Sequence, residues 1–541
     1  MAIQSWQVEA NKCKEILAKS IPKQWLAPAD KLPPADQLNV EDFPRESGLL
    51  TEKELTITEM SATQLVAEMG QGKLTAEEVV IAFLKRATLG HQLLNFATEF
   101  MADEAIARAK ELDEYYKKTG KLVGPLPAQH GVPISVKEHI GLKGRICHTG
   151  YVAWIKNIAP EDALLVQCLK KAGAVFHVRT NQPQSLMHLD CNNNITGMTV
   201  NPYNRKLSPG GSSGGEGASM GFKCAPLGIG TDIGGSIRCP AAFNGAYGFR
   251  PTALRNPYDG IILAGDGQES IRCVVGPLAA QSVEDLELFQ RAVIDQDPWD
   301  IETSLVAMPW KRVESKKDIT IGIMWDDGIV RPHPPITRGL QYAKEKLQAA
   351  GIKAVDWEPF KHDHGWEIIS TLYFPDAAGT QRGIIAESGE PLLPLTEWAF
   401  NYSKPTPLSI TENWEYNVKR EKYRADYHRV MKERGVDFIL SPTFNGVAAG
   451  LGESQYWNYT AIWNILDQPC TIFPTGLFHD PAVDKADPEF KPRNEAEERE
   501  WKKYTPEKFV GAPIALQLTG KHFQDEETLA AAKLVAEIVC S

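Results

Sequence analysis

The sequence predicts an α/β protein built on one central, largely buried sheet. Short apolar runs that fit strands alternate along the chain with longer amphipathic segments that fit helices. The chain has 541 residues, of which 43% are hydrophobic, so it can bury a large core. No internal repeat divides the sequence.

The first third of the chain begins with a predicted helix and an extended segment. Residues 1–20 fit a helix, and residues 22–45 carry enough prolines to favour an extended strap over the surface. The sequence TAEE at residues 75–78 is a capping box that opens a helix running to about Ala87. Residues 102–118 fit the next helix.

From residue 132 onward, strand and helix patterns alternate. The predicted strands are 132–136, 174–178, 319–324, 437–440 and 514–518, and the predicted helices between and after them are 162–172, 337–349 and 526–538. Charged residues crowd the segment 480–508, which is expected to be a surface loop.

Composition excludes several classes of partner. The net charge is −11, and no basic cluster with interleaved aromatic residues suggests nucleic-acid binding. No apolar run approaches the roughly 18 residues that span a bilayer, and residues 1–20 lack the apolar core of a secretory signal. Nine scattered cysteines without C-x-x-C spacing indicate reduced thiols, and we therefore expect a cytoplasmic protein.

Two glycine-rich turns, each presenting serine, lie within residues 207–238. They read GGSSGG at 210–215 and GGS at 234–236. Glycine allows tight turns that bring backbone N–H groups close to a small ligand. A serine ending such a turn can attack a carbonyl while neighbouring N–H groups hold the oxyanion. A flexible linker is the alternative, but the β-prone residues 225–229 between the turns disfavour it.

A different nucleophile, Ser213, fits the G-x-S-x-G pattern of an α/β-hydrolase elbow. That elbow needs a strand directly before it. Residues 201–209 contain two prolines and no alternation, which favours a loop. The elbow stays an alternative.

Lys137 is the candidate base. It ends the predicted strand 132–136, where α/β folds place chemistry. Partial burial there would depress its pKa because burial disfavours the ammonium form. Taken alone, a lysine after a strand is more often a solvated charge.

Together, these motifs resemble the amidase signature family. The residues that carry the resemblance are Lys137, Ser212 and Ser236, with GGSSGG followed by GTDIGGSIR, in the order and spacing of the mammalian-type fatty acid amide hydrolases. Residues 21–25 and 388–391 are similar to the fungal acetamidase and general amidase branch.

The resemblance implies a role for each residue. Ser236 would be the nucleophile, Ser212 the bridging serine and Lys137 the base, with Ser213 supporting them. The implied oxyanion hole is formed by the backbone N–H groups of Ile233, Gly234, Gly235 and Ser236, and Leu186 falls on a substrate-contacting position. Asp232 and Arg238 flank the nucleophile, where an ion pair would fix the loop; two solvated charges are the alternative.

The family also implies an architecture, namely a single domain whose large mixed sheet is covered by helices on both faces. We expect residues 1–75 to form an N-terminal helix and proline-rich strap, and residues 76–541 to form the catalytic domain.

The implied reaction is hydrolysis of small uncharged carboxylic amides to acid and ammonia through an acyl-serine, with no metal and no cofactor. A homodimer is a further expectation. A carbamate, ester or lactam hydrolase using the same triad, and an amidotransferase-type subunit, are the alternatives.

Overall fold

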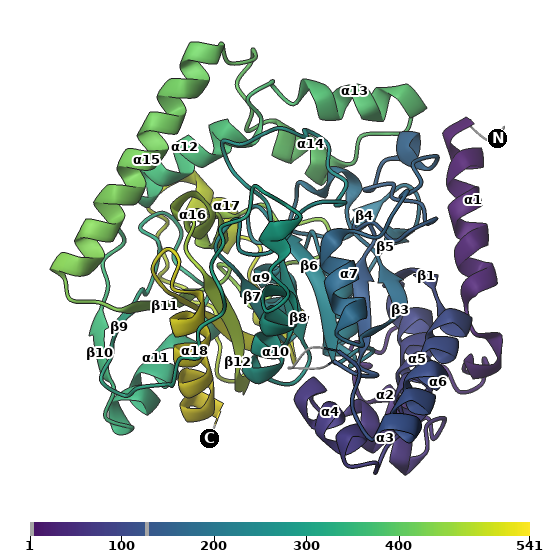
Figure 1. The fold of residues 1–541 in the computed structure, drawn as a ribbon. Coiled ribbons are helices and arrows are strands. Elements are labelled where there is room, and N and C mark those ends of the chain that lie inside the picture. Colours follow the sequence, from purple (N-terminus) through teal and green to yellow (C-terminus); the bar gives the residue numbers. More distant parts are fainter. Residues whose placement is uncertain (1–4, 125–128, 541) are drawn as a thin grey trace.

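One mixed sheet of 11 strands runs through the centre of the molecule (Figure 1). The computed structural model describes residues 5–124 and 129–540. Across the sheet, the strands are β1 (Ala97–Phe100), β3 (Val175–Thr180), β2 (Pro133–Lys137), β6 (Leu227–Asp232), β8 (Val274–Ala279), β7 (Tyr247–Arg250), β12 (Cys470–Phe478), β13 (Pro513–Thr519), β11 (Phe438–Pro442), β9 (Thr320–Ile323) and β10 (Lys353–Asp356). A separate two-stranded sheet pairs β4 (Asn192–Asn193) with β5 (Gly197–Met198).

Strand direction places the predicted site at one edge of the sheet. β2 is parallel to both of its neighbours, β3 and β6. The next pairs, β6 with β8 and β8 with β7, are antiparallel. β2 and β6 run side by side in the same direction. Their last residues, Lys137 and Asp232, therefore both lie where the carboxyl ends of these strands meet.

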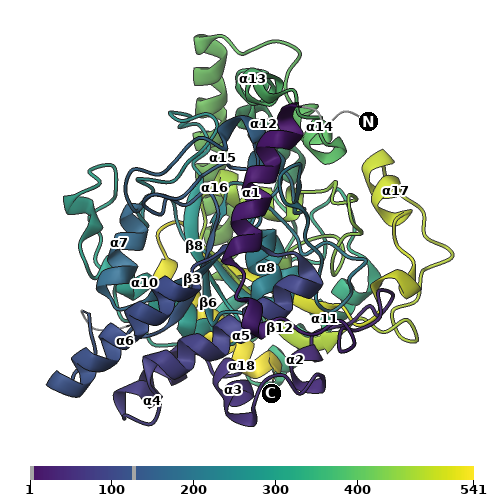
Figure 2. The ribbon, with the colours of Figure 1, turned by 90° about the vertical axis from the view of Figure 1, so that its right-hand side faces the viewer.

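Helices cover both faces of this sheet, as the family resemblance predicts. One face is packed by α7 (Leu164–Lys171), α10 (Val283–Ile294), α11 (Pro334–Ala349) and α18 (Asp525–Cys540). The other face is packed by α8 (Gly214–Gly221) and α9 (Arg238–Phe243). Figure 2 shows the strands between α7 and α10 on one side and α8 on the other.

The N-terminal part lies along the β1 edge of the sheet. Helix α1 (Ser5–Ser20) contacts β1, and Figure 2 shows it crossing this side of the molecule. The strap contains only short helices, η1 (Lys23–Trp25) and α2 (Phe43–Glu46). Two helices that the sequence analysis did not predict follow it, α3 (Glu52–Thr58) and α4 (Ala62–Gly70).

The predicted capping box at Thr75 forms and opens α5 (Ala76–Leu94). The Thr75 side chain accepts a hydrogen bond from the Glu78 N–H, and the Glu78 side chain accepts one from the Thr75 N–H. The helix continues beyond the predicted end near Ala87, because its stop signal is Asn95 in the left-handed conformation. Helix α6 (Ala102–Thr119) follows β1.

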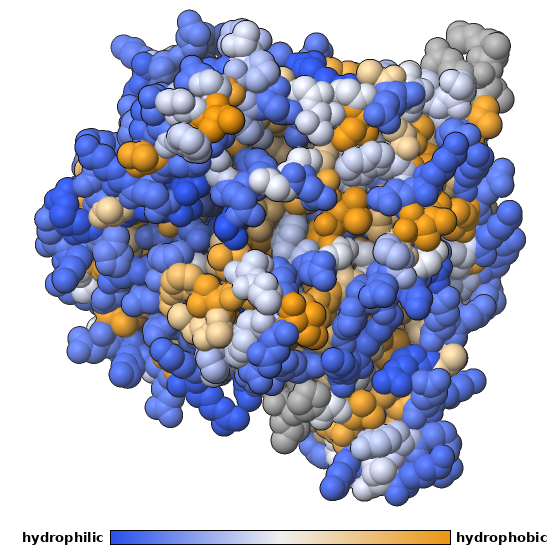
Figure 3. All heavy atoms as spheres, turned by 45° about the horizontal axis from the view of Figure 1, so that its top comes forward, coloured by the Kyte–Doolittle hydropathy of each residue, from blue (hydrophilic) through white to orange (hydrophobic). Residues whose placement is uncertain are grey.

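A group of helices gathers at the end of the molecule drawn uppermost in Figure 1. It comprises α12 (His362–Tyr373), α13 (Gly379–Ser388), α14 (Pro394–Phe400), α15 (Ile410–Glu433) and α16 (Asn458–Leu466). Seen from this end, the surface is mainly hydrophilic with separated apolar groups (Figure 3). No helix within the described ranges is long and apolar enough to cross a membrane.

The prediction of a surface loop at residues 480–508 is wrong in part. Helix α17 (Glu495–Trp501) lies within it, and its Glu497 carboxylate is buried. Arg331 and Arg493 both form ion pairs with Glu497. The charges that suggested a solvated loop therefore anchor a helix to the body of the protein.

Candidate active site

Lys137 and Ser212 meet at the end of β2. The Lys137 side chain is fully buried, and its Nζ lies 2.7 Å from Ser212 Oγ. A second hydrogen bond of 2.9 Å joins Nζ to Thr231 Oγ1, on the adjacent strand β6. The lysine thus contacts two hydroxyl groups, and the sequence analysis did not identify the second one.

Thr231 in turn contacts a buried histidine. His139 Nε2 lies 3.0 Å from Thr231 Oγ1, and His139 Nδ1 lies 2.8 Å from the carbonyl oxygen of Ile262. Burial, reinforced by the nearby Lys137 charge, holds the pKa of His139 well below its ordinary value, so the ring is neutral. Its proton must be on Nδ1, because Nδ1 faces a carbonyl that can only accept.

This tautomer fixes the hydroxyl of Thr231. The unprotonated Nε2 accepts, so the Thr231 hydroxyl donates to it. The oxygen of Thr231 is then left to accept a hydrogen bond from Lys137 Nζ. The sequence gives little indication that Thr231 contacts His139, because the two residues are 92 positions apart.

Ser236 and Ser212 both line a cavity of about 470 Å³. Ser236 Oγ makes no hydrogen bond to any residue that the structure describes, while the Ser236 carbonyl accepts from the Ser213 N–H at 3.2 Å. Leu186 and Ile233 also line this cavity. The three predicted reactive residues are therefore gathered around one cavity, with Lys137 behind Ser212.

The loop that carries Ser236 is held by a buried ion pair between Asp232 and Arg238. Their side chains are fully buried and lie 2.9 Å apart. Although burial alone would raise the pKa of Asp232, the charge and hydrogen bonds of Arg238 hold it well below its ordinary value. Asn464 of α16 donates to the same carboxylate at 2.9 Å. The alternative of two solvated charges is wrong.

One of the four expected oxyanion donors is already occupied. The Gly235 N–H donates to Asp232 Oδ1 at 2.9 Å, because the carboxylate folds back under the turn. The N–H groups of Ile233, Gly234 and Ser236 donate to no residue in the described part of the chain. The donors of this turn that have no acceptor among the described residues are therefore these three.

Gly235 has a structural reason to be glycine. Its φ is +130°, and a Cβ there would lie 2.3 Å from Thr460 Oγ1. That threonine donates to the Gly234 carbonyl at 2.6 Å. A side chain at this position would push α16 away from the loop.

Ser213 is buried and supports the loop. Its Oγ accepts from the Thr231 N–H at 3.3 Å, and the side chain does not line the cavity. The residues directly before it form no strand. The backbone therefore does not form the strand-to-helix elbow that the Ser213 alternative requires.

The electrostatics of the site centre on Lys137. Burial lowers the pKa of Lys137 to about 8, from an ordinary value of 10.5. The buried carboxyl of Glu216 interacts electrostatically with Lys137. Ser135 Oγ and Thr180 Oγ1 both donate to this carboxyl, the latter at 2.7 Å. Burial raises the pKa of Glu216 to about 8, so at neutral pH this carboxyl is mainly uncharged.

Tyr373 of α12 also lines this cavity. Its hydroxyl donates to the carbonyl oxygen of Ile233 at 2.9 Å, and a Cβ on Gly234 would lie 2.7 Å from the same hydroxyl. Tyr373 ends α12, more than one hundred residues from the loop that it contacts. No spacing pattern could have paired them.

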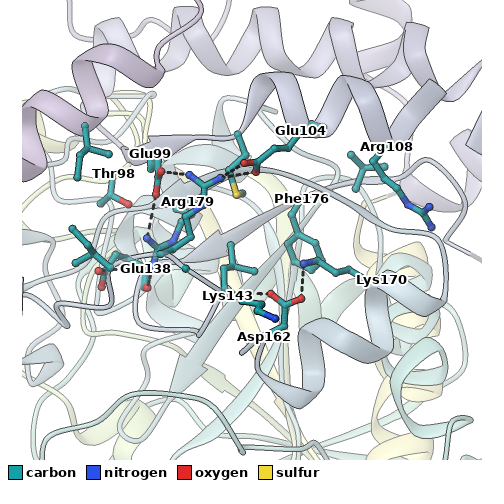
Figure 4. A pocket seen from close by; sticks show the side chains of 18 of the residues that line it. Thr98, Glu99, Glu104, Arg108, Glu138, Lys143, Asp162, Lys170, Phe176 and Arg179 are labelled. Carbon is teal, nitrogen blue, oxygen red and sulfur yellow. Dashed lines mark hydrogen bonds and ion pairs between the residues drawn. The ribbon is translucent and has the colours of Figure 1, made fainter. Parts of the chain in front are cut away.

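A second cavity, of about 960 Å³, lies beside β1 and contains none of Lys137, Ser212 and Ser236 (Figure 4). Several of its charged side chains pair with one another. Arg145 bonds with Glu99 and Glu104, and Lys170 pairs with Asp162 at 2.6 Å. The larger cavity is therefore separate from the one that Ser212 and Ser236 line.

Comparison with known proteins identifies the family. A family model described as Amidase matches residues 78–529, which is most of the chain. The chain belongs to the amidase family. It is therefore a hydrolase acting on amide carbon–nitrogen bonds.

Individual relatives support this membership along the whole length of the amidase. An acetamidase of Emericella nidulans is 40% identical, with 99% of this chain and 98% of the relative covered. An acetamidase of Aspergillus oryzae is 37% identical, with 99% of each chain covered. A solved structure named fatty acid amide hydrolase superposes with a TM-score of 0.95 at 44% identity, covering 99% of this chain and 95% of that one.

Proposed function

We propose that this amidase hydrolyses small uncharged carboxylic amides to acid and ammonia through an acyl group carried on Ser236. In this proposal Ser212 bridges the nucleophile to Lys137, which acts as the base. The observation that carries the proposal is the 2.7 Å contact between Lys137 Nζ and Ser212 Oγ, beside a cavity that Ser236 also lines.

The hydrogen-bond directions favour proton transfer from Ser212 to Lys137. A neutral amine has two N–H groups and one lone pair. One N–H of Lys137 is directed to Thr231, whose hydroxyl is turned toward His139. The lone pair is then free to accept the proton of Ser212, while Ser212 takes the proton of Ser236 as that oxygen attacks the carbonyl.

Collapse of the tetrahedral intermediate reverses the relay. The ammonium of Lys137 returns its proton through Ser212 to the departing nitrogen, because an amine leaves poorly unless it is protonated. The N–H groups of Ile233, Gly234 and Ser236 would hold the oxyanion, where losing one donor typically costs about 3–4 kcal/mol. Water then attacks the acyl-serine by the same relay.

Cavity size bears on the substrate. A volume of about 470 Å³ lies within the range of about 300–1,000 Å³ typical of small-molecule sites, and it admits acyl groups larger than acetyl. Apolar walls at Leu186 and Ile233 suit an uncharged group beside the amide. Esters and carbamates fit the same machinery, and we expect them to react more weakly; a lactam is the remaining alternative.

We also propose that the protein works in the cytoplasm. All nine cysteines are free thiols, as is usual in a reducing compartment. A homodimer remains a prediction.

Covalent labelling tests the nucleophile. The purified amidase would be treated with a fluorophosphonate, digested and mapped by mass spectrometry. We expect the label on Ser236, loss of labelling in Ser236→Ala, and retained labelling in the matched control Ser213→Ala. A label on Ser213 in the unaltered protein would contradict the proposal. Ammonia release from a series of aliphatic amides would test the substrate class in parallel.

A further inference from the structure

The cavity that holds Ser212 and Ser236 changes its chemistry along its length. At its buried end, apolar side chains such as Leu186, Ile233 and Tyr373 surround the reactive serines. At its mouth, the lining residues come from the loop 263–271 and from helices α13 and α15. Trp414 of α15 is 64% exposed there, so this end opens to solvent.

The mouth carries acidic side chains without matching cations. Among the described residues that line the cavity there are three carboxylates, on Asp266, Glu269 and Asp376, and there is no lysine, arginine or histidine. Glu269 pairs with Arg272 outside the cavity. Asp266 and Asp376 are left without an ion-pair partner among the residues that the structure describes, and burial raises the pKa of Asp266.

Arg420, which contacts residues of the mouth, does not offset these charges. Arg420 of α15 does not line the cavity, and its guanidinium donates to the carbonyl oxygen of Ser270 and to Asn417 Oδ1. It also pairs with Glu421 at 2.8 Å. The potential inside the mouth is therefore negative.

One buried polar group at the mouth has no protein partner. Gln381 of α13 lines the cavity and is only 7% exposed, and its Oε1 is buried without a hydrogen-bond partner in the described ranges. Leaving such a group unpaired costs about 1–3 kcal/mol. A ligand that reaches the mouth with a hydrogen-bond donor would satisfy this group.

From these observations we propose that the mouth is a subsite for the far end of the acyl group, selecting ends that donate hydrogen bonds or carry positive charge. This inference rests on the proposed amidase function, because with ammonia as the leaving group everything larger belongs to the acyl part. The favoured class is an aliphatic amide with a hydroxyl or ammonium group at its far end. Acyl groups ending in a carboxylate are rejected by Asp266 and Asp376.

The test compares amides that differ only at the far end. Hexanamide, 6-hydroxyhexanamide, 6-aminohexanamide and the monoamide of adipic acid would be assayed for kcat/KM by ammonia release, together with the corresponding eight-carbon set. In at least one set we expect the ammonium-ended amide to exceed the carboxylate-ended amide by about tenfold or more. Added salt should reduce this ratio, since the mouth is open to solvent.

Substitutions at the mouth test which side chains select the far end of the acyl group. Combining Asp266→Asn with Asp376→Asn should bring the ammonium-to-carboxylate ratio close to one. Gln381→Leu should lower the preference for the hydroxyl end over the methyl end by about fivefold. The matched control is Glu387→Gln, because Glu387 is exposed on the same helix as Gln381 and does not line the cavity. This control should keep all the ratios.

The outcomes separate the two proposals. Hydrolysis of all the amides with equal kcat/KM in both sets would overturn the subsite and leave the amidase proposal standing. A ratio that survives the double substitution would also overturn it. Failure to hydrolyse any of the amides would overturn the proposed substrate class and this inference with it.

Discussion

Lys137 should set the acidic limb of the pH–rate profile. The relay needs its neutral form, and burial lowers its pKa to about 8. At pH 7 about one-tenth of the lysine is then neutral, against about one part in three thousand at the ordinary value of 10.5. Burial thus raises the population of the active base about 300-fold, equivalent to about 3 kcal/mol.

The expected profile follows from this pKa. Measured as kcat/KM for a neutral amide, activity should rise tenfold per pH unit below about pH 7 and level off above about pH 9. The apparent pKa belongs to the coupled Lys137–Ser212–Ser236 network. Lys137→Ala should lose about a thousandfold or more on amides, and less on esters, whose leaving group needs little protonation. Lys137→Arg should not restore activity, because guanidinium stays protonated.

Two controls distinguish loss of the base from loss of folding or of side-chain packing. Thermal melting of each variant shows whether the protein still folds, and Lys137→Met keeps the length of the side chain without a base. If Lys137→Ala retained near-normal amidase activity with the same pH limb, the lysine-base mechanism would be refuted.

Three further changes test the surroundings of the relay. Asp232→Asn leaves Arg238 buried and unpaired, so chemical denaturation should show a loss of about 3–5 kcal/mol; in the unaltered protein, this contribution is present above the unfolded pKa of about 4 and is lost as the pH falls through the depressed native value. Gly235→Ala should destabilise the fold and lower kcat, since its Cβ meets Thr460. Glu216→Gln should keep activity and the pH limb, because a carboxamide replaces a mainly protonated carboxyl, whereas Glu216→Ala should lose activity. Overnight dialysis against a chelator should leave amide hydrolysis unchanged.

Local signals in the sequence predicted five of the eleven strands of the central sheet and several helix starts. The apolar run before Lys137 forms β2, and the Thr75 capping box opens α5. The same signal was overlooked at Thr51 and Ser61, whose capping boxes open α3 and α4. These two helices could therefore have been predicted from the sequence.

Other parts of the site depend on contacts between distant segments. Thr460 and Asn464 of α16 hold the nucleophile loop from more than two hundred residues away. The engagement of the Gly235 N–H by Asp232 depends on the exact path of the turn, which residue spacing does not encode. The glycine- and serine-rich motif indicated which residues gather at the site. Which backbone N–H groups are free to bind an oxyanion could be found only from the backbone geometry.

The arrangement of charges around Lys137 explains how one buried lysine can serve as a base. A carboxylate in direct contact would favour the ammonium form and raise the pKa of the lysine. Asp232 lies near the lysine, but its charge is committed to Arg238, and Glu216 is mainly protonated at neutral pH. The hydrogen-bond partners of Lys137 are hydroxyl groups, which can pair with both protonation states. Desolvation therefore prevails, and the amine keeps the lone pair that the proposed relay requires.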